Sequence, residues 1–107
     1  MADAYIANGN AIGKSYIDLS RYPVGGTDMA NVSHIVPSIH PEFAIGAPPS
    51  IQNHTRDFTD LACTDAAHAA MLDAAYLLAV TTIELVLDRN LLACVKEEFD
   101  AETRTKV

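Results

Sequence analysis

The segment from Asp65 to about Leu87 constrains the fold of this chain more than any other part of the sequence. Thr64 stands at the position of an N-cap and Asp65 complements the helix dipole, so the segment is predicted to form one long helix. Its apolar residues occupy nearly every angular position of that helix: Ala66, Ala67, Ala69, Ala70, Ala74, Ala75, Leu77, Leu78, Ala79, Val80, Ile83 and Leu85. A helix that is apolar all round must be buried on most sides.

Shorter elements are predicted before this helix. They are a helix over residues 2–14, a strand over residues 16–19, a helix over residues 28–35, a buried strand over residues 42–47 and a polar loop over residues 48–59. Thr27 or Asp28 can accept a hydrogen bond from an early N–H of the second helix, and Pro37 ends it. Pro48 and Pro49 close the second strand.

A final amphipathic helix follows the long one. Asn90 is its expected N-cap, and its apolar stripe comprises Leu91, Leu92, Val95 and Phe99. Charged residues lie on the opposite side, as in a helix at a protein surface. The segment 101–107 is expected to be a disordered tail.

This set of elements is incomplete as a domain. Two short strands do not cover a long helix that is apolar on every side, and large exposed apolar patches are uncommon on soluble monomers. The sequence therefore predicts that further structure packs on the long helix, in the same polypeptide or in another.

Composition narrows the classes of function. The 107 residues fit one small domain or a piece of one, and the formal net charge is -7. An acidic chain lacks the Lys and Arg that displace counterions from phosphates, so nucleic-acid binding is not expected.

No signal peptide is evident. The longest apolar run, residues 74–80, is too short to span a membrane. Cys63 and Cys94 form no CxxC pair and are expected to be buried free thiols. We expect a soluble, cytoplasmic protein.

The four histidines differ in their settings. Their spacings match no compact zinc motif, and His34, His40 and His68 are each interpreted as structural. His54 follows a predicted buried strand within a polar loop, where α/β proteins place functional side chains. It is either a functional residue or an exposed loop histidine.

A glycine-containing loop, Gly25-Gly26-Thr27-Asp28, precedes the helix predicted from residue 28. Unpaired N–H groups at such a place favour an anion, for instance a substrate carboxylate. A plain turn with an N-cap explains the same residues.

Four runs of residues, taken in order, resemble the C-terminal block of the aminoacylase and carboxypeptidase-G type of zinc metallopeptidase. They are Gly26-Thr27-Asp28-Met29-Ala30-Asn31-Val32-Ser33, Val36-Pro37-Ser38-Ile39-His40-Pro41, Ile45-Gly46-Ala47 and Asn53-His54-Thr55. Within this family the chain looks most like the branch of β-alanyl-lysine dipeptidase and p-aminobenzoyl-glutamate hydrolase.

The resemblance implies an α/β fold, in which residues 1–107 form the C-terminal portion of a dizinc-peptidase catalytic domain without its lid and dimerisation domain. It implies that His54 binds one of two zinc ions and that Gly26, Thr27 and Asp28 lie at the substrate side. The remaining zinc ligands and the Glu that activates water belong to an earlier part of the family's catalytic domain. Family members homodimerise through the lid domain.

The implied function is hydrolysis of an amide in a small dipeptide-like substrate, of the β-alanyl-lysine or aminoacyl-glutamate type. Zinc polarises such an amide and lowers the pKa of its bound water. Because catalytic zinc normally needs three protein ligands, this chain alone is expected to be inactive. The alternative is a non-catalytic interaction module, or truncated paralogue, that docks on a partner chain.

Overall fold

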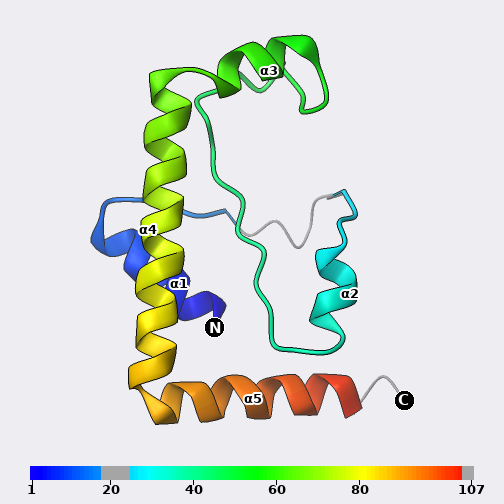
Figure 1. The fold of residues 1–107 in the computed structure, drawn as a ribbon, viewed down its shortest axis with the longest axis vertical. Coiled ribbons are helices and arrows are strands. Elements are labelled where there is room, and N and C mark those ends of the chain that lie inside the picture. The colour runs from blue at the N-terminus through cyan, green and yellow to red at the C-terminus, as the bar shows by residue number, and fades with distance from the viewer. Residues whose placement is uncertain (18–24, 105–107) are drawn as a thin grey trace. The chain divides into compact units, whose positions relative to one another are not determined.

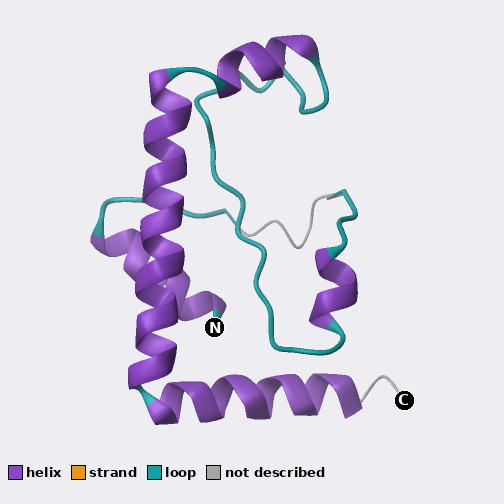
Figure 2. Ribbon diagram, viewed as in Figure 1, coloured by secondary structure: helices purple, strands orange, loops and turns teal. Residues whose placement is uncertain are grey.

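A computed structural model describes residues 1–17 and 25–104 of the chain. Within those residues the regular structure is helical (Figures 1 and 2): α1 (Ala2–Ala11), α2 (Met29–Ser33), α3 (Arg56–Ala62), α4 (Asp65–Leu87) and α5 (Arg89–Arg104). The chain divides into two compact units. One comprises Met1–His40 with Val80–Val107, and the other comprises Pro41–Ala79.

The first unit is held together by α1 against the C-terminal part of α4. Asn8 Nδ2 donates to Thr81 Oγ1 at 3.2 Å and to Glu84 Oε2 at 2.8 Å. Thr81 is only 3% exposed, so its hydroxyl would lack a partner without this bond. Tyr5, which is buried, meets Tyr16 edge to face with 5.8 Å between ring centroids. Polar and aromatic contacts thus fix the place of α1.

The buried Tyr5 gives the chain a predicted pH dependence. Burial raises the pKa of Tyr5 above its ordinary value of 10.0, and the neighbouring Tyr16 adds to the shift. The folded state therefore favours the neutral phenol. The free energy of unfolding should lose this contribution as the pH rises past about 10, where the unfolded phenol ionises first. Urea melts across this range should show the decline, Tyr5→Phe should reduce it, and Tyr76→Phe, at a 54% exposed site, should not.

Helix α4 confirms the predicted long helix with its predicted bounds. Its first turn is capped by Thr64, whose Oγ1 accepts from the backbone N–H of Ala67 at 3.3 Å. One stripe of the helix is buried, namely Ala67, Ala74, Leu77 and Thr81. At 100° per residue, the stripe opposite is formed by Leu72, Tyr76, Ile83 and Val86, which are 64%, 54%, 56% and 72% exposed. We call these four residues the outer face of α4.

Length and composition also suffice for α4 to cross a membrane, in contrast to the expectation from the run 74–80. The core helix of a soluble protein passes the same test. Asp73 lies one turn from the middle of the helix, where a carboxylate in a bilayer costs about 2.5–3.5 kcal/mol. One such helix is weak evidence for a membrane span.

Helix α5 has the predicted stripe, with Val95 buried and Leu91, Leu92 and Phe99 half-buried. Its N-cap was predicted wrongly. Asp88, not Asn90, caps the helix: its Oδ1 accepts from the N–H of Asn90 at 2.9 Å and of Leu91 at 3.1 Å. The helix continues through Arg104, into the segment for which a disordered tail was expected, and residues 105–107 lie outside the described part.

The cap of α5 yields a testable difference between two neighbouring residues. Asp88→Ala should lower the free energy of unfolding by about 1 kcal/mol, because two N–H groups lose their acceptor. Asn90→Ala should change it by less than about 0.5 kcal/mol, as for ordinary surface positions. Chemical denaturation of both variants measures the difference, and equal losses would contradict the assignment of the cap.

The α/β part of the predicted fold is not found in the described residues. Residues 42–47, predicted to be a strand, form no ladder, because a strand needs a hydrogen-bonded neighbour and no other described segment supplies one. Of the strand predicted over 16–19, residues 18 and 19 lie outside the described residues, and Tyr16 and Ile17 are irregular. Helix α3 occupies part of the predicted polar loop.

The two cysteines are free, as predicted, but both are exposed rather than buried. Cys63 is the C-cap of the short helix α3. Cys94 lies next to the buried Val95 on α5, so its side chain is turned about 100° away from that of Val95. Apolar neighbours in the sequence therefore misled the burial prediction.

Candidate functional site

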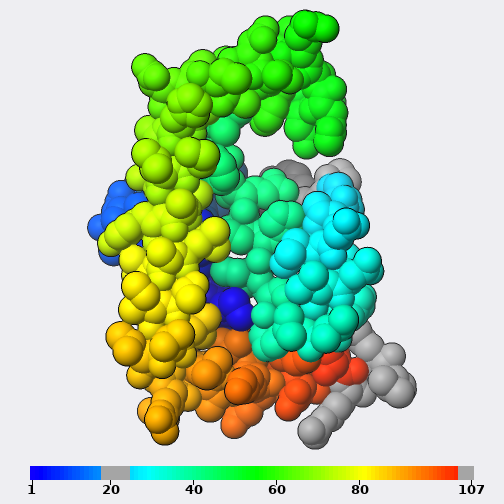
Figure 3. Space-filling model, in the orientation of Figure 1, coloured from blue at the N-terminus to red at the C-terminus, as the bar shows by residue number. Residues whose placement is uncertain are grey.

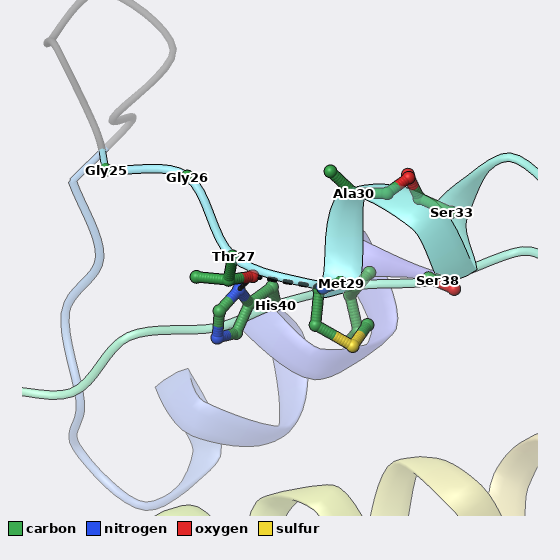
Figure 4. A pocket seen from close by; sticks show the side chains of 9 residues that line it. Gly25, Gly26, Thr27, Met29, Ala30, Ser33, Ser38 and His40 are labelled. Atoms are coloured by element: carbon green, nitrogen blue, oxygen red, sulfur yellow. Dashed lines mark hydrogen bonds between the residues drawn. The ribbon is translucent and has the colours of Figure 1, made fainter.

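A hollow of about 220 Å³ lies in the first unit, around the glycine-containing loop and α2 (Figure 4). Its lining consists of Gly25, Gly26, Thr27, Met29, Ala30, Ser33, Ser38, Ile39 and His40. Two of the three predicted substrate-side residues, Gly26 and Thr27, are among them. Asp28 precedes α2 without a side-chain capping bond and is not part of the lining.

Thr27 organises this hollow. Its Oγ1 accepts from the backbone N–H of Met29, the first residue of α2, at 3.2 Å, while the N-cap position itself is occupied by Asp28 without a side-chain capping bond. The same oxygen lies 3.4 Å from Nδ1 of His40. Figure 4 shows the imidazole directly beside Thr27, with its other nitrogen on the far side of the ring. The Thr27 hydroxyl of the loop therefore contacts both the start of α2 and the segment that follows α2.

His40 was interpreted as a structural histidine, but it is exposed and lines the hollow. Its partner Thr27 is 13 positions earlier, so the contact depends on how the chain turns back after α2. A separation of 13 positions does not by itself indicate that two side chains are in contact. His34, at the end of α2, and His68, in the first turn of α4, are exposed rather than packing residues.

His54 lies in the second unit, exposed, immediately before α3. It is the one non-glycine residue of the described chain with a positive φ, at 62°. Histidine is enriched in this left-handed region, yet strain of this kind persists only where the surroundings fix it, often at functional sites.

Thr55, the residue after His54, holds the surrounding turn in place through two hydrogen bonds. Thr55 Oγ1 donates to the carbonyl of Gln52 at 2.7 Å and accepts from the N–H of Phe58 at 3.2 Å. Thr55 is thus the N-cap of α3 and closes the turn that contains His54. The imidazole is presented from a hydrogen-bonded turn at the start of a helix.

The described residues do not form a metal centre by themselves. No group of three or more His, Cys, Asp or Glu side chains in residues 1–17 and 25–104 has an arrangement that would hold a metal ion. A catalytic zinc site needs three protein ligands, so His54 alone does not fit a complete zinc site.

Over most of its length the chain is homologous to part of a dipeptidase-type peptidase. It is 37% identical over 102 residues to the Xaa-Arg dipeptidase of Mus musculus, an alignment that covers 92% of this chain. It is 36% identical over 99 residues to the Xaa-Arg dipeptidase of Homo sapiens, covering 90% of this chain. The dipeptidase part of the resemblance is thereby supported, while the particular branch is not.

The chain spans less than a quarter of the length of these relatives, 23% and 22% respectively. No family model matches the sequence, and no solved structure matches it.

Proposed function

We propose that this chain is a segment of a metal-dependent dipeptidase or amidohydrolase that cleaves the amide of a small dipeptide-like substrate. The observation that carries the proposal is the similarity to two Xaa-Arg dipeptidases over nine-tenths of the chain. A β-alanyl-lysine or aminoacyl-glutamate substrate is proposed from the sequence resemblance. The names of the relatives make an Xaa-Arg dipeptide the first substrate to test.

We infer that His54 supplies one ligand to a zinc site, and that Gly26, Thr27 and Asp28 belong to the substrate side. The strained, exposed and hydrogen-bonded setting of His54 supports its role. From the family resemblance, we propose that the other ligands of two zinc ions belong to an earlier part of the catalytic domain. The chain alone is accordingly proposed to be inactive.

The outer face of α4 supports the proposal that further structure covers this segment. Leu72, Tyr76, Ile83 and Val86 are each more than half exposed, and burying such side chains contributes roughly 25 cal/mol per Å². The proposed covering is the remainder of the catalytic domain. In that setting α4 is the interior helix of a soluble, cytoplasmic enzyme.

A segment chimera tests the proposed function. The aligned part of the mouse Xaa-Arg dipeptidase is replaced by this chain, and hydrolysis of alanyl-arginine is measured after purification. We expect a folded, zinc-dependent chimera that hydrolyses the dipeptide, because 37% identity preserves the packing of the replaced segment. The unaltered mouse enzyme is the positive control, and this chain alone is the negative control.

The same exposed face favours one alternative function, a non-catalytic module that docks on a partner chain through α4. This alternative predicts a folded chimera without hydrolysis. It also predicts that this chain forms a complex with a separate partner chain, which sedimentation of the two together would reveal.

A further inference from the structure

Among the described residues that line the hollow beside Thr27, His40 has a ring nitrogen that the fold does not use for a hydrogen bond. Thr27 Oγ1 already accepts from the N–H of Met29, so the position of this oxygen is fixed relative to α2. Nδ1 of His40 lies 3.4 Å from the same oxygen, and the tautomer of the ring decides which of the two atoms donates. An imidazole that accepts at Nδ1 carries its own proton on Nε2. In that tautomer Thr27 orients the ring and Nε2 is a donor.

The other hydroxyls of the hollow are committed to nearby carbonyls. Ser33 Oγ donates to the carbonyl of Ala30 at 2.8 Å, and Ser38 Oγ donates to that of Val36 at 3.0 Å. A hydroxyl has one proton to donate, so neither serine can donate to a ligand while these bonds are kept. Among the described side chains that line the hollow, His40 with its proton on Nε2 is therefore the donor left for a ligand.

The electrostatic character of the hollow also selects the ligand. The chain has 14 acidic residues and a net charge of -7, yet none of the described residues that line this hollow has a carboxylate. The remaining lining is glycine backbone and small or apolar side chains. An anionic group placed here meets the N–H donor of His40, and the described lining residues bring no carboxylate against it.

Size limits how much of a ligand enters. Pockets that enclose a drug-sized molecule measure roughly 300–1,000 Å³, whereas this hollow measures about 220 Å³. It accommodates one end of a dipeptide.

We propose that His40 binds the terminal carboxylate of a dipeptide ligand, donating from Nε2 while Thr27 holds the ring through Nδ1. The choice of a dipeptide rests on the proposed function. The assignment of His40 and of a carboxylate rests on the hollow itself. His40 is thus a ligand-binding residue that the sequence did not reveal.

Nuclear magnetic resonance of the histidine ring nitrogens tests this proposal on the 107-residue chain, without metal or hydrolysis. The probes are alanyl-arginine and the same dipeptide with its carboxylate replaced by an amide. The acid should shift the Nε2 resonance of His40 saturably. It should bind about tenfold more tightly than the amide, because hydrogen bonds to charged groups are the stronger ones.

Variants separate the roles of the two ring nitrogens. His40→Gln places an amide N–H near the position of Nε2 and should retain part of the affinity, whereas His40→Ala should abolish it. Thr27→Val should weaken binding and Thr27→Ser should restore it. His34→Gln, at an exposed histidine outside the hollow, is the matched control. Amide spectra establish that each variant is folded.

Equal binding of acid and amide, an unresponsive His40 resonance, or full binding by folded His40→Ala would each overturn the proposal. These outcomes are separable from a failure of the proposed function. An inactive chimera leaves the ring-nitrogen result standing, and an active chimera with an unresponsive His40 refutes the inference about His40 alone.

Discussion

Leu77→Ala is expected to lower the free energy of unfolding of the isolated chain by about 2–5 kcal/mol. Leu77 is 2% exposed at the centre of the buried stripe of α4, so truncation removes buried methyl groups and leaves a cavity. Since small domains are stable by only about 5–15 kcal/mol, this is a large fraction of the total. Urea denaturation followed by circular dichroism measures the loss.

Leu72→Ala is the matched control on the same helix. Leu72 is 64% exposed, and its truncation should change the stability of the isolated chain by less than about 0.5 kcal/mol. In the segment chimera the same change should cost about 2 kcal/mol or more, because the outer face of α4 is then covered. A negligible effect of Leu72→Ala in both settings would contradict the covered face, and a negligible effect of Leu77→Ala would contradict the packing of α4.

His54→Ala in the chimera is expected to reduce hydrolysis of alanyl-arginine by more than about a hundredfold. Loss of residues that merely support metal ligands costs about 10–100-fold, and loss of a ligand itself should cost more. The zinc content per chain should fall in parallel. His68→Ala, at an exposed histidine on α4, should leave both quantities unchanged. Normal zinc content and normal hydrolysis in the His54→Ala chimera would refute the assignment of His54.

The helices were predictable where local signals and burial agree. Thr64 and the alanine-rich run defined α4, and the stripe ending at Phe99 defined α5. Asp88 was overlooked as a cap because Asn90 two residues later is an equally good capping residue by type. Helix α3 was missed because only seven residues form it and because the segment was interpreted as a polar loop, although the spacing of Phe58, Leu61 and Ala62 after the N-cap Thr55 is helical.

The strand predicted over residues 42–47 failed for a different reason. Its apolar character predicted burial, yet residues 42–47 are exposed or half-buried in the structure. A strand also needs a neighbouring strand, and that partner is not encoded locally. The proposed remainder of the catalytic domain is the place where such a partner would be found.

The candidate sites were only partly predictable. His54 was singled out by its position in a polar loop, but its left-handed backbone follows from the turn closed by Thr55. His40 was missed because its contact with Thr27 joins two segments separated by α2. The sequence therefore indicates residue types and caps, whereas the meeting of distant side chains requires the fold.

The rate of alanyl-arginine hydrolysis by the unsubstituted segment chimera tests the central claim most directly. A dipeptidase segment should sustain zinc-dependent hydrolysis that is lost on chelation and recovered on adding zinc. A chimera that melts cooperatively, yet hydrolyses alanyl-arginine no faster than this chain alone, would contradict the claim.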